Sequence, residues 1–111
     1  MSEKPKDVLV ILNKKNFSEV IKSGRPVFID FWAEWCMPCK IMHPIFAKLA
    51  EKYSSRITFG RLNTDENSEV AAMYQVYGIP SFIMFLNGEP VDRVVGAVGE
   101  AGLEKVIQKY I

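Results

Sequence analysis

Cysteine and histidine are scarce in this sequence, and the common cofactor motifs are missing from it. The chain of 111 residues contains two cysteines and one histidine, whereas a closed zinc site takes four ligands. The sequence has no Gly-rich nucleotide-binding motif of the GxGxxG kind, so the chain cannot take electrons from a nucleotide by itself. We therefore expect a protein that binds no cofactor and no metal.

Charge and hydrophobic runs argue against several kinds of partner. The formal net charge is +1, with 14 basic and 13 acidic residues interspersed along the chain. This balance gives no electrostatic reason to expect binding to nucleic acid or to an anionic membrane. No apolar run approaches the length of a membrane span. The first seven residues are polar and charged and lack the apolar stretch of a signal peptide, so we expect a soluble, cytoplasmic protein.

The length and the composition indicate one folded domain. Apolar residues make up 49% of the chain, which at this length is enough for a sizeable core without disulfide or metal staples. We expect a flexible N-terminal tail over residues 1–7 and a single domain over residues 8–111. The small size and the lack of a second apolar face favour a monomer.

Apolar patterns and turn residues predict the element order β-α-β-α-β-α-β-β-α. Strands are expected at short apolar runs, over residues 8–12, 27–32, 57–62, 81–86 and 91–95. Helices are expected where apolar residues recur every three or four positions, over residues 14–22, 36–53, 67–74 and 99–110. Between and within these elements we expect a helix cap at Asn13, a helix kink at Pro44 and a hairpin turn at Asn87 and Gly88. This order predicts an α/β fold with a central mixed sheet between helices.

The two cysteines, Cys36 and Cys39, stand three positions apart, directly after the apolar run over 27–32. A thiol at the start of a helix has a lowered pKa, because the helix amides carry partial positive charge. Cysteines at positions i and i+3 share one helix face, so that their sulfurs can join. The loop they would close is too short to restrict the unfolded chain much. The spacing therefore predicts a redox pair rather than a structural disulfide.

Metal binding is the alternative for this pair. His43 lies one turn after Cys39 and could share its helix face, which gives a half-site with three ligands at most. Zinc or iron–sulfur binding would need a dimer that shares the site. A packed or surface position is the simpler interpretation of His43.

Asp30 is the one charged residue in the apolar run over 27–32. Burying a carboxylate is costly, and desolvation raises its pKa. The position therefore has two interpretations. Either Asp30 lies at a wet edge or is simply hydrogen-bonded, or it is buried for a functional reason.

These segments together resemble the thioredoxin family, and the resemblance covers nearly the whole chain. It rests on the string DFWAEWCMPCK at residues 30–40, on YGIPS at 77–81 and on VGA at 95–97, in this order. A lone CxxC would be weak evidence, whereas the three strings in this order are specific. The resemblance implies the thioredoxin fold, a central mixed β-sheet flanked by helices on both faces, and an activity of dithiol–disulfide exchange.

The resemblance also implies a role for each residue of the site. Cys36 would be the nucleophile, better placed than Cys39 for the helix amides and for solvent, and Cys39 would resolve the mixed disulfide. Asp30 would accept the proton of Cys39, directly or through water. Pro80 would be the cis-proline of a loop that lies against the cysteines, where the backbone of Ile79 would pair with an extended substrate.

Other residues would contact partners or tune the site. An apolar rim around the sulfurs would suit many protein partners, and it would comprise Trp35, Met37, Pro38, Gly78, Ile79, Gly96 and Ala97. Gly96 could instead mark a bulge at a strand end. Arg61 stands where the family usually carries lysine, and an arginine there would stay charged and alter the electrostatics of Asp30. Arg61 could equally be a solvated strand residue. Lys40 is a second tuning candidate. Met37 replaces the glycine that is common between the cysteines, which leaves the reduction potential open.

The predicted function is that of a general protein-disulfide reductase, an electron carrier in cell redox homeostasis. The Cys36/Cys39 dithiol would reduce disulfide-containing protein substrates, and a thioredoxin reductase, linked to NADPH or to ferredoxin, would recharge it. One alternative is an oxidant or isomerase of the same fold, which would need an export signal that the sequence does not show. The other is a binding module whose thiols are incidental. The only redox group expected is the Cys36–Cys39 disulfide itself.

Overall fold

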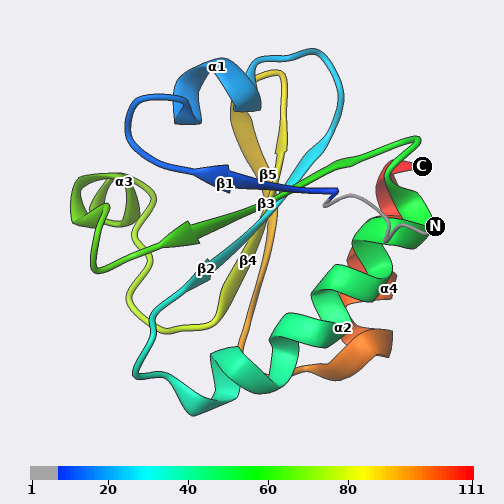
Figure 1. The fold of residues 1–111 in the computed structure, drawn as a ribbon. Coiled ribbons are helices and arrows are strands. Elements are labelled where there is room, and N and C mark those ends of the chain that lie inside the picture. The colour runs from blue at the N-terminus through cyan, green and yellow to red at the C-terminus, as the bar shows by residue number, and fades with distance from the viewer. Residues whose placement is uncertain (1–7) are drawn as a thin grey trace, which may run out of the picture.

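A five-stranded sheet lies between helices on both of its faces (Figure 1). The computed structural model describes residues 8–111; the tail predicted over residues 1–7 lies outside the described residues. The strands are β1 (Leu9–Leu12), β2 (Val27–Trp32), β3 (Thr58–Asn63), β4 (Ser81–Leu86) and β5 (Glu89–Val95). The helices are α1 (Phe17–Ile21), α2 (Met37–Tyr53), α3 (Ser68–Met73) and α4 (Gly99–Ile107), followed by the 3-10 turn η1 (Gln108–Tyr110). This architecture confirms the predicted fold class.

The sheet is mixed, and β2 lies at its centre. The strand order is β1-β3-β2-β4-β5. Strands β1, β3 and β2 run parallel, whereas β4 is antiparallel to β2, and β5 is antiparallel to β4. A parallel neighbour needs a crossover connection, and helices supply it. The central strand β2 ends at Trp32, and the turn that follows it leads to Cys36 and the start of α2.

Alternate residues of β2 serve two separate cores. Phe28 packs with α2 and α4 in one cluster, while Val27, Ile29 and Phe31 pack with α1 and α3 in the other. Strand side chains alternate between the faces of a sheet, so Asp30 falls on the same face as Phe28, the face that α2 covers. All five residues are buried, as the uninterrupted apolar run predicts for a central strand.

Helix α2 begins immediately after Cys36 and continues for 17 residues. The apolar stripe predicted from sequence faces the core and comprises Met42, Ile45, Phe46, Leu49 and Tyr53. The ring of Phe46 lies between 5.4 and 5.7 Å from those of Phe28, Phe59 and Phe82. Pro44 lies inside the helix without ending it. Packing of the stripe thus holds the helix, and the cysteines at its start, against the sheet.

Helix α1 is shorter than the sequence predicts. Its first residue is Phe17 and its N-cap is Asn16, not the expected Asn13. The side chain of Asn13 accepts hydrogen bonds from the amides of Lys15 and Asn16, at 2.8 and 3.1 Å. An asparagine that bonds to backbone two residues ahead forms a turn instead of a helix start, and this moves the first turn of α1 three residues along the chain.

The hairpin between β4 and β5 turns on Asn87 and Gly88, as predicted. Both have positive φ, 54° and 85°, the combination that favours Asn-Gly in two-residue hairpin turns. Strand β5 therefore starts at Glu89, two residues earlier than expected. Pro90 fits within it because a register shift lies opposite, between Met84 and Phe85, and because β5 is an edge strand that can accept a proline.

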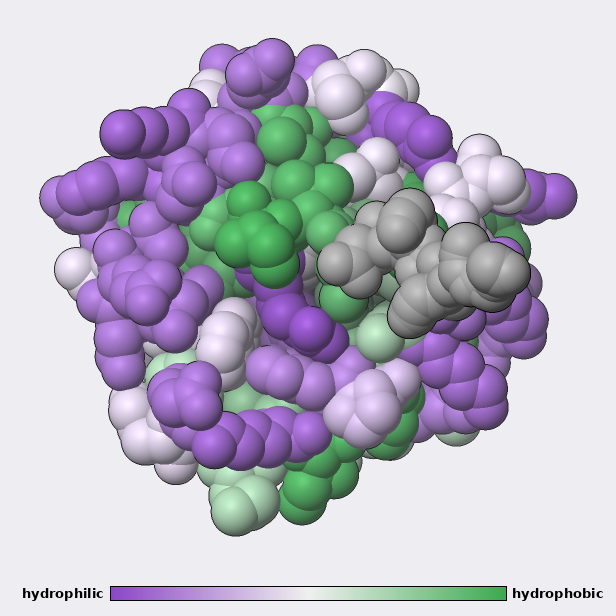
Figure 2. Space-filling view, in the orientation of Figure 1, coloured by the Kyte–Doolittle hydropathy of each residue, from purple (hydrophilic) through white to green (hydrophobic). Residues whose placement is uncertain are grey.

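One exposed surface feature lies over strand β1. Figure 2 shows apolar side chains gathered at the centre of this face, with charged side chains around them. Ile11, on β1, is 69% exposed.

None of the helices within residues 8–111 is both long enough and apolar enough to cross a bilayer.

Candidate active site

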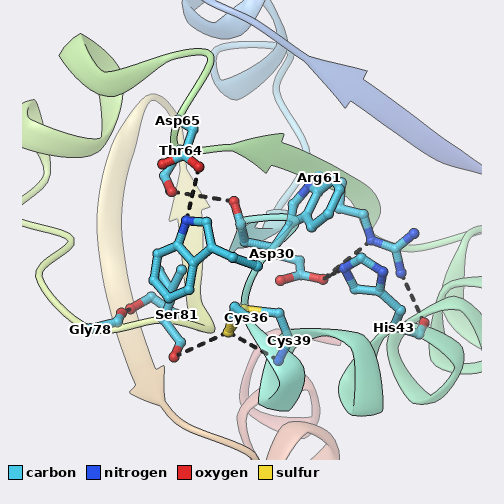
Figure 3. The surroundings of a disulfide bond; sticks show 12 residues. Asp30, Cys36, Cys39, His43, Arg61, Thr64, Asp65, Gly78 and Ser81 are labelled. Atoms are coloured by element: carbon cyan, nitrogen blue, oxygen red, sulfur yellow. Dashed lines mark hydrogen bonds and ion pairs between the residues drawn. A yellow bond between two sulfur atoms is a disulfide. The ribbon is translucent and has the colours of Figure 1, made fainter.

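Cys36 is the N-cap of α2, and Cys39 lies in the first turn of that helix. The two sulfurs are joined in a disulfide, with the Cα atoms 5.2 Å apart, within the normal range for such a bond. The backbone amide of Cys39 donates a hydrogen bond to Sγ of Cys36 over 3.2 Å. A helix-start amide that points at a sulfur stabilises its thiolate when the bond is reduced. Figure 3 shows this contact at the centre of the site.

Both cysteines are more enclosed than the sequence suggests. Cys36 is 3% exposed and Cys39 is completely buried, so the expected difference in accessibility is present but small. Ala33, Trp32 and Ile79 pack around the pair. The covering residue Ile79 comes from a segment forty residues further along the chain. Burial by such a distant segment is a tertiary effect that the local sequence does not reveal.

The segment at Gly78–Pro80 lies against the cysteines, as the resemblance implies. The Ile79–Pro80 peptide bond is cis, and the carbonyl oxygen of Ile79 lies 3.8 Å from Sγ of Cys36. Ser81 closes the segment by donating a hydrogen bond from its hydroxyl to the carbonyl of Gly78 (Figure 3). Pro80 is buried, Ile79 is half-buried and Gly78 is exposed. The loop therefore presents the backbone before the proline to the opening above the sulfurs.

Large apolar side chains stand exposed beside the cysteines. Trp35 is 71% exposed and Met37 is 64% exposed. The indole Nε1 of Trp35 donates a hydrogen bond to Asp65 over 2.9 Å, which fixes the ring at one orientation. The sequence analysis gave no role to Asp65. It also gave none to Tyr77, which directly precedes Gly78 and is 86% exposed. The signal for Tyr77 was its place directly before the Gly-Ile-Pro string.

The loop after β5 joins the same surface. Gly96 has a φ of 104°, a conformation that glycine adopts without strain. Its amide donates a hydrogen bond to the carbonyl of Pro80 over 2.8 Å, so the two loops are linked. Ala97 and Pro38 are both exposed. The structure thus brings the predicted rim residues to one end of the sheet, and Gly96 follows the last strand residue instead of bulging within it.

Asp30 lies beneath this surface and is fully buried. Its Oδ2 accepts a hydrogen bond from Nε of Arg61 over 3.2 Å, and the Arg61 side chain is 16% exposed. Arg61 is therefore a mostly buried partner of the carboxyl and not a freely solvated strand residue. Burial raises the pKa of Asp30 from 3.8 to about 7, against the lowering effect of the Arg61 charge and hydrogen bond. Oδ1 of Asp30 has no hydrogen-bond partner within the described residues.

His43 also faces Asp30, from the first half of α2. Its Nε2 lies 3.8 Å from Oδ2 of Asp30 and is buried without a hydrogen-bond partner in the described part of the chain. Arg61 donates a second hydrogen bond to the backbone carbonyl of His43 over 2.8 Å. Burial, helped by the Arg61 charge, lowers the pKa of His43 to about 4. His43 is thus a neutral, half-buried neighbour of the carboxyl at neutral pH (Figure 3).

Lys40 forms an ion pair with Glu34. Its Nζ is 3.4 Å from Glu34, and both side chains are about half exposed or more, at 47% and 76%. An exposed pair of this kind contributes little to stability. Within residues 8–111, no group of three or more His, Cys, Asp or Glu side chains is placed to hold a metal.

Comparison with known proteins agrees with this geometry. The sequence profile of the Thioredoxin family matches residues 8–109. The chain belongs to the thioredoxin family. It is 45% identical over 93 residues to a thioredoxin of Porphyra purpurea, covering 84% of this chain and 87% of the relative. It is 44% identical over 87 residues to a bifunctional thioredoxin reductase/thioredoxin of Mycobacterium leprae, covering 78% of this chain and 19% of that protein.

A solved structure with the same fold is that of mitochondrial thioredoxin 3 from Saccharomyces cerevisiae in its oxidised form. The TM-score is 0.83 at 32% identity, over 91% of this chain and 94% of the other. The Cys36–Cys39 pair at disulfide distance and the family assignment together make this thioredoxin-family protein a thiol–disulfide oxidoreductase that acts as a disulfide reductase.

Proposed function

We propose that this protein is a general protein-disulfide reductase in which Cys36 is the nucleophile and Cys39 the resolving thiol. The single observation that carries the proposal is the hydrogen bond from the Cys39 amide to Sγ of Cys36 at the start of α2. A helix-start amide stabilises negative charge on that sulfur, and only the thiolate form of a cysteine is nucleophilic.

The reaction takes two exchange steps. The Cys36 thiolate attacks one sulfur of a target disulfide, whose S–S bond breaks, and the other target sulfur leaves as a thiolate. Cys39 then loses its proton and attacks the Cys36 sulfur of the mixed disulfide. The bond between Cys36 and the target breaks, and the second target thiolate leaves. The target has gained two electrons, and the protein ends as the Cys36–Cys39 disulfide.

We assign Asp30 as the acceptor of the Cys39 proton. A general base works best when its pKa lies near the operating pH, and burial raises the pKa of Asp30 to about 7. The carboxyl is on the face of β2 that α2 covers, with the cysteines on one side of it and His43 on the other (Figure 3). Arg61 accompanies it as a fixed positive charge, which favours the ionised form that can accept a proton.

The exposed rim would hold the target protein. Trp35 and Met37 offer apolar contact without strict charge matching. The backbone before Pro80 would pair with an extended segment of the target, because the Ile79 carbonyl lies 3.8 Å from the nucleophilic sulfur. A target bound in this way would carry its disulfide to the narrow opening at Cys36.

A thioredoxin reductase, linked to NADPH or to ferredoxin, would restore the dithiol. Support comes from the Mycobacterium leprae relative, whose name joins a thioredoxin reductase to a thioredoxin in one protein. We place the cycle in the cytoplasm, where the glutathione and thioredoxin systems keep thiols reduced, and in a monomeric chain. No bound cofactor enters the cycle beyond the disulfide.

Trapping of the mixed disulfide tests the assignment of the two thiols. In Cys39→Ser, the first exchange proceeds and the second cannot, so a covalent complex with a protein disulfide such as insulin should accumulate. Cys36→Ser is the matched control, and it should form no complex and reduce no insulin. Insulin reduction by Cys36→Ser at the wild-type rate would overturn the assignment.

The reduction potential of the Cys36–Cys39 pair tests the direction of the reaction. Equilibration in graded glutathione or dithiothreitol buffers should give a potential below the cytosolic glutathione poise, as a reductant requires. A potential well above that poise would favour the oxidant or isomerase. The absence of a reversible couple would favour the binding module.

A further inference from the structure

The buried carboxyl of Asp30 has no direct contact with solvent. It is completely buried, yet a proton acceptor must release its proton after each cycle and take one up before the next. Our inference rests on the proposed function of Asp30 and concerns the path that this proton takes.

A surface cavity of about 360 Å³ stops short of Asp30. Trp32, Glu34, His43 and Arg61 are among the residues that line it, and Asp30 is not. Two side chains, His43 and Arg61, therefore both line the cavity and lie within 4 Å of the carboxyl. Figure 3 shows these two side chains on one side of the carboxyl and the cysteines on the other.

Only one of the two side chains can pass a proton. The guanidinium of an arginine stays protonated at all physiological pH values and has no acceptor atom. Imidazole has two nitrogens, one of which can accept a proton while the other gives one up. In His43 the buried, unpartnered Nε2 faces Asp30, while the side chain as a whole is 22% exposed.

We propose that His43 is the proton relay between Asp30 and the solvent-filled cavity. Nε2 accepts the proton from the Asp30 carboxyl, and Nδ1 releases its own proton to water, so the ring stays neutral overall. When the protein is recharged, the transfer runs in reverse: Nδ1 takes a proton from water and Nε2 returns one to Asp30. The two transfers restore the original tautomer in each full cycle.

The charges around the ring fit a relay that does not store the proton. Arg61 from β3, Lys40 from α2 and Glu34 from the turn before α2 act on His43, and the net effect with burial is a pKa of about 4. Glu66, after β3, lines the same cavity, and Cys39 lies on the opposite side of Asp30 (Figure 3). Because the imidazolium is less stable than the protonated carboxyl, the ring does not hold both protons, and Nδ1 releases one to water as Nε2 accepts the other.

Proton exchange at Asp30 is the quantity to measure. Isotope-edited NMR of the Asp30 carboxyl carbon in the full, oxidised chain reports whether the two protonation states interchange fast or slowly during a pH titration. The wild type should give one resonance that moves with pH. His43→Gln keeps a polar side chain of similar size that cannot relay, and it should slow the exchange by about tenfold or more, seen as broadened or separate resonances.

Free imidazole provides the decisive comparison. Exchange should be slow in His43→Ala, and added imidazole should restore it by occupying the vacated space; His43→Gln leaves no such space and should not respond. Glu66→Gln is the matched control, because it removes a titratable group from the cavity without touching Asp30, and its exchange should equal that of the wild type.

Two results would overturn the relay: wild-type exchange in His43→Gln, or slow exchange in His43→Ala that imidazole does not restore. A separate measurement tests the role of Asp30 itself. Reduced protein is mixed with a chromogenic aromatic disulfide, and the second release of coloured thiol reports the attack of Cys39. If Asp30→Asn leaves this second release unchanged, Asp30 is not the proton acceptor, whatever the exchange measurement gives.

Discussion

Arg61 stands directly opposite Asp30 in the parallel pairing of β2 and β3, and its Nε donates a hydrogen bond to Oδ2 of Asp30 over 3.2 Å. Two opposing influences therefore act on the same carboxyl. Burial favours its neutral form, and the guanidinium favours its ionised form. Because Arg61 is also held at the His43 carbonyl, its charge is fixed in place beside the carboxyl.

Removing this charge should raise the pKa of Asp30 above about 7. Arg61→Met keeps most of the apolar stem and leaves burial as the dominant influence on the carboxyl. A titration followed by NMR of the Asp30 carboxyl measures the shift. Arg61→Lys is the matched control, and it should show a smaller rise, since it keeps a positive charge but not the rigid guanidinium. An unchanged pKa in Arg61→Met would show that the ion pair has no net effect.

Asp30→Asn should stabilise the protein at neutral and alkaline pH. The pKa of Asp30 is 3.8 when unfolded and about 7 when folded. The folded state therefore binds the extra proton between these values, and the contribution of Asp30 to stability falls as pH rises through that range. Well above pH 7, the variant should gain on the order of 4 kcal/mol in the free energy of unfolding. Urea unfolding at a series of pH values checks this, and near pH 3 the two proteins should be equally stable.

His43 should give protein stability a pH dependence opposite to that of Asp30, and His43→Gln should remove it. The pKa of His43 is 6.5 when unfolded and about 4 when folded, so its contribution to stability is present above the unfolded value and is lost as pH falls through that range. In the wild type this loss and the Asp30 contribution run in opposite directions between about pH 4 and 6.5 and offset each other. Urea unfolding should therefore give a nearly flat wild-type profile. The stability of His43→Gln should decrease with rising pH, and that of Asp30→Asn should increase.

Met37→Gly should weaken the reduction of protein targets more than that of small disulfides. Met37 is 64% exposed beside Cys36, so its side chain is free to be covered by a bound partner. Losing about 1 kcal/mol of apolar contact would raise KM for insulin about fivefold with little change in kcat. Met37→Leu is the control that keeps an apolar side chain. An equal loss of rate with a small aromatic disulfide would show instead that Met37 acts on the thiols.

The cysteine site was predictable because its geometry is local. Cys36 and Cys39 lie within one helical turn, and the apolar run before them had to form a covered strand. The enclosure of Cys36 was not predictable from that string, because it depends on Ile79 crossing over from another part of the chain. Local hydrogen bonding also decided the start of α1, where the side chain of Asn13 formed a turn.

The surroundings of Asp30 depend on packing between distant elements. Arg61 is 31 residues away in sequence, and the register of β2 and β3 places it opposite the carboxyl. Sequence reasoning identified Asp30 and listed Arg61, but left open whether Arg61 is solvated. It gave His43 no contact with the carboxyl, since that contact exists only because α2 lies across the face of the sheet that bears Asp30.

The two outer strands disfavour edge-to-edge pairing between copies of this chain. Strand β1 has four residues, and β5 carries Pro90, Asp92 and Arg93 along its mostly exposed length. A short edge, a proline without an amide hydrogen and exposed charges all discourage a second sheet from pairing alongside. The molecule can therefore expose Trp35, Met37 and Tyr77 at one end of its sheet, while the edge strands β1 and β5 resist aggregation through intermolecular strand pairing.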